Sequence, residues 1–285
     1  PEGSRTPRLR TALARWLTDA EGGAGHLLAR VIANRLWQHH LGRGLVSTPS
    51  DFGAQGERPT HPELLDWLAA ELIRGGWRLK PLHKLILKSA VYLQGSQSDA
   101  ARAAADPEGK LLWRRERRRL EGEAIRDSML ALSGLLDRRM YGPGSLDEGH
   151  RRRSIYFTVK RSQLIPMLLA FDGPDGNQPL ASRGVTTVAP QALLLMNSPH
   201  VQAWAQGFAG RLLPAARESR ERAVREGYAL ALGRPPDGEE LRQAAAFLGE
   251  QIESYRGSGK PDALELALAD FCQSLFGLNE FIYLD

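Results

Sequence analysis

Apolar residues in this chain recur mostly at helical spacing, in short runs that glycine and proline interrupt. Leu9, Leu13 and Trp16 follow one such repeat, and residues 22–25, with three glycines, end it before another helix begins near His26. Repeats of three and four residues place apolar side chains on one helical face, where they can form a core. The sequence therefore predicts a mainly α fold, a multi-helical domain.

The helix that begins near His26 is expected to bury Leu28, Ile32 and Leu36 and to end at Gly42. Glycine favours this position because the residue after a helix often adopts a left-handed conformation. Residues 47–58 contain one proline and two glycines and show no periodicity, which is typical of an ordered loop.

Two further starts of helices carry capping signals. Thr60 and Glu63 have the spacing of a capping box ahead of a leucine-rich run. Asp237 and Glu240 repeat that spacing later in the chain. A long helix is expected over about 118–140.

A short β element is predicted at about 154–160, because the segment SIYFTVK is rich in β-branched and aromatic residues. Residues 281–284 are a candidate partner strand, since they are also short and apolar. The whole chain, 1–285, is interpreted as one family domain, with a helical main body over 1–213 and a helical C-terminal lobe over 214–285.

Composition excludes several classes of protein. No apolar run approaches the roughly 18 to 20 residues of a membrane span. Because Cys272 is the single cysteine, the chain itself has no disulfide, no thiolate metal site and no haem-attachment motif, and no cofactor is expected in it. The formal charge is +5, and arginines greatly outnumber lysines, which favours planar partners such as carboxylate, phosphate or sulfate.

Several ordered segments carry a resemblance to a known family. They are RVIANRLWQHHLGRGLV from Arg30, TPSDFG from Thr48, THPELLDWLA from Thr60, RRLEGEAIRD from Arg118, TTVAPQALLLMNSP from Thr186, LGRPP from Leu232 and LNEFIYLD from Leu278. Together they resemble the planctomycete-specific domain of unknown function found C-terminal to planctomycete cytochrome-type regions in exported proteins. The resemblance covers nearly the whole chain.

The resemblance implies an exported context at the cell surface, in the periplasm or outside the cell. It also implies neighbouring modules in a larger multidomain protein. Haem would belong to a separate module of that parent protein, because this chain has no attachment motif. The expected partners are therefore the neighbouring domains. The family brings no catalytic residue to this chain.

A first candidate binding site lies on the helix, loop and helix start between residues 34 and 61. Its polar and titratable side chains could line a cleft or could instead hold the irregular loop in place. The metal interpretation is weak, because the histidines lack the spacing of known metal motifs. The candidates are Asn34, Arg35, His39, His40, Asp51 and His61.

A second candidate set is Arg119, Glu123, Arg126 and Asp127, which would meet on one face of the expected long helix. Either these residues form a salt-bridge network or the carboxylates serve a sugar-binding cleft. Nearby arginines lower carboxylate pKa values, which disfavours a general acid here.

Three functions remain open from the sequence. The first is a non-catalytic structural or interaction module of a larger exported, cytochrome-associated protein. The second is a carbohydrate-active or polysaccharide-binding enzyme domain with a cleft around residues 34–61, its ligand an anionic polysaccharide. Nucleic-acid binding through arginine patches is the third, and it rests on charge alone. No enzyme motif was found, so the sequence favours a protein without catalytic activity.

Overall fold

The structure is a computed structural model that describes residues 8–177 and 180–284. It confirms the mainly helical fold. The described residues form two compact units, one up to Arg118 and one from Arg119 to Leu284. Each unit has its own hydrophobic core. The division falls at residues 118 and 119, a different position from the lobe boundary expected near residue 213.

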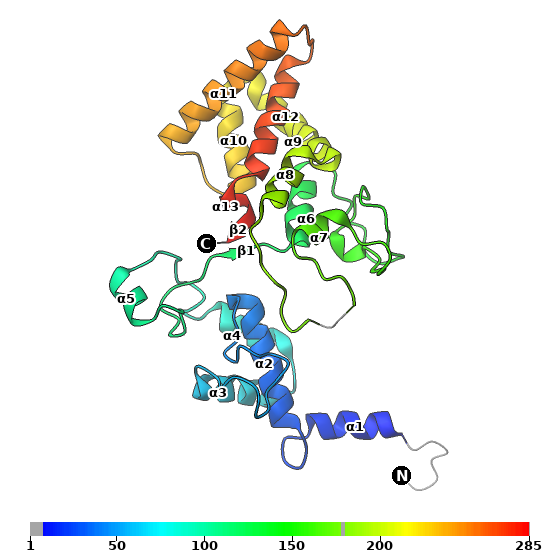
Figure 1. Cartoon of the computed structure of the whole chain (residues 1–285), viewed down its shortest axis with the longest axis vertical. Coiled ribbons are helices and arrows are strands. Elements are labelled where there is room, and N and C mark those ends of the chain that lie inside the picture. The colour runs from blue at the N-terminus through cyan, green and yellow to red at the C-terminus, as the bar shows by residue number, and fades with distance from the viewer. Residues whose placement is uncertain (1–7, 178–179, 285) are drawn as a thin grey trace. The chain divides into compact units, whose positions relative to one another are not determined.

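The first unit contains five helices among its described residues, and Figure 1 labels them. Its core is formed by α2, α3 and α4 together with Leu45 and Val46 from the intervening loop. The helices are α1 (Leu9–Thr18), α2 (Gly25–Leu41), α3 (Pro62–Arg74), α4 (Leu79–Leu87) and α5 (Ala100–Ala105).

Helix α2 buries a different face from the one expected. Ala29, Ala33 and Trp37 are at most 3% exposed, whereas the predicted stripe of leucine and isoleucine is only half-buried. Two of these three positions are alanines, so the buried face of α2 is marked mainly by small side chains. The helix ends as expected at Gly42, whose φ is 90°.

Helix α3 begins one residue later than the capping-box prediction. Its N-cap is His61, and no side chain caps it. The Thr60 hydroxyl instead donates to the carbonyl of Leu45 at 3.4 Å, which anchors the end of the loop. The predicted capping box at Thr60 is therefore wrong, while the box at Asp237 and Glu240 is confirmed at the start of α11.

The second unit is a helical assembly in which α9 packs against α12, α10 and α6 (Figure 1). Its core includes Phe208, Leu212, Phe271 and Phe276, each at most 2% exposed. Cys272 lies in this core, where burial raises the pKa of its thiol. The elements are α6 (Gly122–Leu132), α7 (Pro166–Ala170), α8 (Ala189–Asn197), α9 (Pro199–Glu218), α10 (Arg220–Leu232), α11 (Gly238–Gly257), α12 (Ala263–Phe276) and α13 (Asn279–Ile282).

The β element lies elsewhere than predicted. Residues 154–156 form a single turn of 3₁₀-helix, and Phe157 makes only an isolated β-bridge with Ser145, so the predicted strand there is wrong. Instead β1 (Arg118–Arg119) pairs with β2 (Tyr283–Leu284). The expected partner segment at 281–284 therefore does end in a strand, but its neighbour is the arginine pair.

The expected long helix is also shorter. Its first residues belong to β1, and α6 spans Gly122–Leu132. The helix stops at Ser133 because Gly134 has a φ of 74°, a left-handed conformation that a right-handed helix does not continue. As a result Arg119 lies outside the helix that carries Glu123, Arg126 and Asp127.

Candidate functional site

A groove of about 490 Å³ opens in the second unit between α8 and the C-terminal segments α12, α13 and β2. This volume lies within the range of roughly 300 to 1,000 Å³ that is usual for ligand sites. The groove is lined by Arg119, Phe171, Thr187, Val188, Gln191, Ala192, Leu195, Met196, Asp270, Gln273, Ser274, Gly277, Asn279, Ile282 and Tyr283.

Two helices line the groove lengthwise. Residues 188, 191, 192, 195 and 196 come from α8 and its N-cap, and residues 270, 273, 274 and 277 come from α12 and its C-cap. Steps of three and four residues place these side chains on one face of each helix. Apolar side chains including Phe171, Leu195 and Ile282 line it, and Met196 remains 63% exposed.

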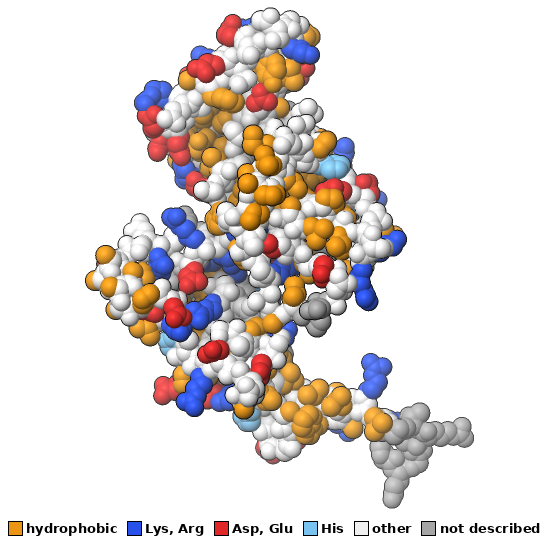
Figure 2. All heavy atoms as spheres, in the orientation of Figure 1, with side chains coloured by type: hydrophobic (Ala, Val, Ile, Leu, Met, Phe, Trp, Pro, Cys, Tyr) orange, Lys and Arg blue, Asp and Glu red, His pale blue; other side chains and the backbone are white. Residues whose placement is uncertain are grey.

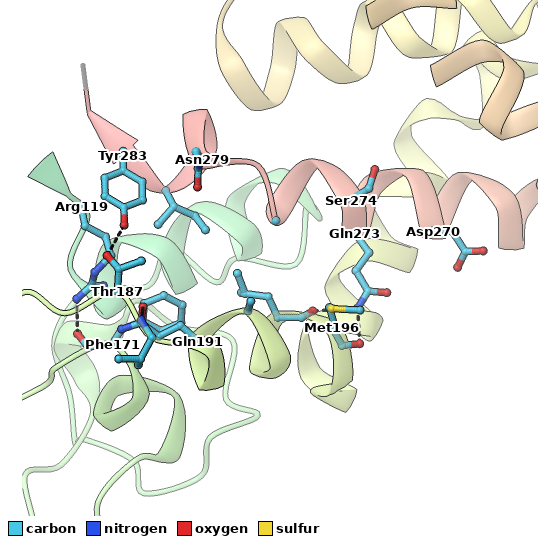
Figure 3. A pocket seen from close by; sticks show the side chains of 15 residues that line it. Arg119, Phe171, Thr187, Gln191, Met196, Asp270, Gln273, Ser274, Asn279 and Tyr283 are labelled. Carbon is cyan, nitrogen blue, oxygen red and sulfur yellow. Dashed lines mark hydrogen bonds between the residues drawn. The ribbon is translucent and has the colours of Figure 1, made fainter. Parts of the chain in front are cut away.

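Arg119, Thr187 and Tyr283 form one end of the groove (Figure 3). The Arg119 guanidinium contacts the carboxylate of Asp172 at 2.5 Å and donates to the carbonyl of Phe171 at 3.3 Å. Its buried Nε–H has no hydrogen-bond partner among the described residues. The hydroxyls of Thr187 and Tyr283 lie 2.7 Å apart. This end therefore offers hydrogen-bond donors, with the arginine charge balanced by Asp172.

The opposite end carries the carboxylate of Asp270, near Gln273 and Ser274 (Figure 3). Asp270 accepts a hydrogen bond of 2.8 Å from the hydroxyl of Tyr255. This hydrogen bond raises the pKa of Tyr255, and the burial of the hydroxyl raises it further. Among the groove's lining residues, Asp270 is the one carboxylate, and no arginine or lysine is paired with it among the described residues.

Gln273 joins the two helices that line the groove. Its amide nitrogen donates to the carbonyls of Leu195 and Met196 at 2.9 and 2.8 Å. These carbonyls lie in the last turn of α8, where helix geometry leaves them without an intrahelical partner. A side chain of α12 thus holds the end of α8 at a fixed separation and keeps the groove formed.

The predicted cluster at 34–61 lies in the first unit, where Asn34 ties the loop to α2. Its amide donates to the carbonyl of Val46 at 3.0 Å and accepts from the amide of Val46 at 2.8 Å, and the side chain is fully buried. A Cβ at Gly44 would come within 2.9 Å of the Asn34 amide, so glycine is required there. This geometry supports the interpretation of Asn34 as a structural residue.

The two adjacent histidines have different surroundings. The His40 Nε2 lies 2.7 Å from Nδ1 of His83 on α4. Burial lowers the pKa of His40, and the nearby His83 and Arg118 lower it further, so its neutral form is favoured. His39 is exposed, and its backbone carbonyl accepts a hydrogen bond of 2.8 Å from Arg118.

The other candidates of this cluster make local contacts. Asp51 is exposed and accepts from the amide of Gly53 at 2.8 Å, as a residue that closes a turn does. His61 contacts the Thr60 hydroxyl at 3.0 Å, and Arg35 is exposed. No set of three or more histidines, cysteines and carboxylates is placed to hold a metal ion in residues 8–177 and 180–284.

The second candidate set is spread over several contacts in the second unit. Arg183 pairs with Glu123 at 2.7 Å. Burial raises the pKa of Glu123, but the hydrogen bond from Arg183, a backbone hydrogen bond and the charge of Arg183 together outweigh it, so the net pKa is lowered. Asp127 accepts hydrogen bonds from the amide and hydroxyl of Ser154 at 2.7 and 2.8 Å. The lowered pKa of Glu123 does not suit a general acid.

Arg126 is fully buried and acts as an internal anchor. It donates to the carbonyls of Arg152, Glu148 and His150 on the irregular segment before η1 (Ser154–Tyr156). Its guanidinium also lies 4.6 Å from the Phe157 ring centroid and 5.6 Å from that of Trp204. The contacts satisfy loop carbonyls that would otherwise be buried without partners.

The groove was not predicted from the sequence, although Arg119 was among the candidates. Its other lining residues fall mainly in two segments already noted as distinctive, TTVAPQALLLMNSP and LNEFIYLD. Their helical spacing could have shown that each presents a mixed apolar and polar face. A sequence alone could not show that these two faces, about 80 residues apart, leave a space between them.

The fold and the groove define a class of protein, a mainly helical domain with an open, largely apolar binding groove. Within that class the chain is identified by its sequence: a family model for proteins of unknown function (PSD1, DUF1553) matches residues 9–248, and the chain belongs to this family. The matched residues include Arg119, Phe171 and α8, whereas the α12 side of the groove follows them. No curated protein and no solved structure matches the chain. Within the described part of the chain, the helices are too short or too polar to cross a membrane.

Proposed function

We propose that this chain is a non-catalytic interaction module of a larger exported, cytochrome-associated protein, and that its α8–α12 groove is the surface that binds a partner. The groove carries the proposal, because it combines an apolar lining with a few polar groups at fixed positions. The exported setting and the haem in a separate module come from the family resemblance. The expected partners are neighbouring domains of the parent protein.

The contacts of the titratable groups support binding rather than catalysis. Glu123, Asp127 and Asp172 each accept hydrogen bonds from neighbouring groups. A general acid or base needs a proton that it can exchange with a substrate, and it usually has a pKa near the working pH. The first unit's His40 is engaged with His83 instead of with an orienting carboxylate.

Methionine methyl NMR offers a direct test, because the chain has four methionines in distinct settings. Met196 lines the groove, Met140 is 67% exposed elsewhere, and Met129 and Met167 are buried. With ¹³C-methyl-methionine in the full chain, a library of apolar fragments and short peptides should shift the Met196 signal and leave Met140 unchanged. Substituting Met196→Ala should remove that signal and identify it.

Heparin and duplex DNA serve as the competing probes in the same experiment. Shifts caused by heparin alone would favour a polysaccharide-binding domain, and hydrolysis of a polysaccharide would contradict a non-catalytic module. Salt-sensitive binding of unrelated DNA sequences would instead favour the nucleic-acid function. A library that leaves Met196 unshifted would remove the groove from consideration.

A further inference from the structure

The helix α1 has an apolar face that the described structure leaves uncovered. Leu9, Leu13 and Trp16 are 69%, 55% and 52% exposed, and α1 has no buried residue. Figure 2 shows hydrophobic side chains gathered along this helix. Their spacing of four and three residues is the pattern by which an amphipathic helix binds a groove.

The charge of α1 is also one-sided. It carries Arg10 and Arg15 and no acidic residue. In the groove, Asp270 is the lining carboxylate without an arginine or lysine partner, whereas the charge of Arg119 is balanced by Asp172. The two surfaces are therefore complementary both in apolar character and in charge.

The dimensions of the two surfaces agree. The groove face of α8 runs from Val188 to Met196, which is about 12 Å at a rise of about 1.5 Å per residue. The apolar face of α1 from Leu9 to Trp16 is about 10 Å long by the same rise. About two turns of helix, at about 5.4 Å per turn, would thus fill the length of the groove.

We propose that the α8–α12 groove of one molecule binds α1 of a second copy of this chain. The inference rests on the proposed function of the groove as a binding surface, and it assigns the groove to a second copy in place of a neighbouring domain. Helix ends set the direction: the N-terminus of α1, with its partial positive charge and Arg10, lies toward Asp270. The C-terminal end of α1 then lies toward the end of the groove that Arg119, Thr187 and Tyr283 form.

The decisive probe is a synthetic peptide of residues 8–19, titrated into the full chain labelled with ¹³C-methyl-methionine. The peptide should shift the Met196 signal and leave the Met140 signal in place. A matched peptide with Leu13→Asp should bind at least about tenfold more weakly, because it places a charge in the apolar contact. If the native peptide leaves Met196 unshifted, the inference is overturned.

Sedimentation of the full chain tests whether a second copy of the chain occupies the groove. The mass should rise with protein concentration, and the surface substitutions Leu13→Asp or Met196→Asp should each abolish this rise. A chain that stays monomeric at every concentration would overturn the second copy as occupant even if the peptide binds.

Charge exchange tests the direction of binding. Arg10→Glu should weaken self-association by about tenfold, and adding Asp270→Lys should restore it. If both variants are folded and the double variant does not regain self-association, the contact between Arg10 and Asp270 is contradicted. If other peptides or fragments shift Met196 while the α1 peptide does not, the groove remains a binding surface and only its assignment to α1 is lost.

Discussion

Asn34 shows how much one buried amide can fix in an irregular loop. Replacing it with alanine removes both hydrogen bonds to Val46 and leaves that residue's backbone groups without partners. We expect Asn34→Ala to reduce the free energy of unfolding by about 2 to 3 kcal/mol. The neighbouring Arg35 is exposed, so Arg35→Ala should change the free energy of unfolding by less than about 0.5 kcal/mol. Urea denaturation of both variants measures the difference, and equal stabilities would contradict the anchoring role.

Glu240 links stability to pH at the start of α11. The hydrogen bond from Arg234 lowers the pKa of Glu240 from 4.5 to about 2, while burial opposes it. A carboxyl with a lowered folded-state pKa stabilises the protein above its unfolded pKa and loses that effect as the pH falls. Wild type should therefore be more stable than Glu240→Gln near neutral pH, by about 1 kcal/mol. Thermal unfolding should show this advantage disappearing between pH 4.5 and about 2; an advantage that persists below that range would count against the ion pair.

At the scale of elements, a close approach between α6 and the end of α7 depends on Gly122. A Cβ added there would lie 2.9 Å from the Cβ of Phe171, so Gly122→Ala must push the two elements apart. We expect it to destabilise the protein by about 1 to 3 kcal/mol. Gly210 in α9 has no atom within 4 Å of an added Cβ, and Gly210→Ala should stabilise by about 0.5 to 1 kcal/mol. Opposite signs in chemical denaturation are the expected outcome, and a stabilising Gly122→Ala would refute the packing argument.

Element boundaries could be predicted where local chemistry decides them. The end of α2 at Gly42 and the capping box at Asp237 both follow from glycine and capping residues near the break. The β element could not be predicted in this way. Arg118 and Arg119 have no strand signal of their own, and their pairing with residues about 165 positions later is set by tertiary contacts.

The candidate sites show the same division. The structural interpretation of Asn34 needed only an irregular loop beside a helix, and the contacts support it. The prediction that Arg119 and Glu123 share one helical face was wrong, because the helix begins at Gly122, later than the periodicity suggested. The groove depends on the separation of two helices, which Gln273 holds across 77 residues of sequence. Local spacing carries no information about such a separation.

At the scale of the molecule, the two hydrophobic cores share no residue. Of the six tryptophans, five belong to the first unit, and Trp204 alone belongs to the second. With fluorotryptophan, NMR can follow both units at once during urea unfolding. Substituting Arg126→Met should lower the free energy of unfolding of the second unit by about 3 kcal/mol, because loop carbonyls lose their donor. The Trp204 signal should therefore change at a lower urea concentration. The five other signals should keep their midpoint, and a common shift of all six would show that the cores unfold as one.

Cys272 gives the molecule a practical property. Thiols react as thiolates, and a buried thiol with a raised pKa is scarcely ever in that form. The thiol of the folded wild-type chain should therefore not react with maleimide dyes. A cysteine introduced at an exposed position would be the single attachment point for a fluorophore or cross-linker, without any need to remove the natural one.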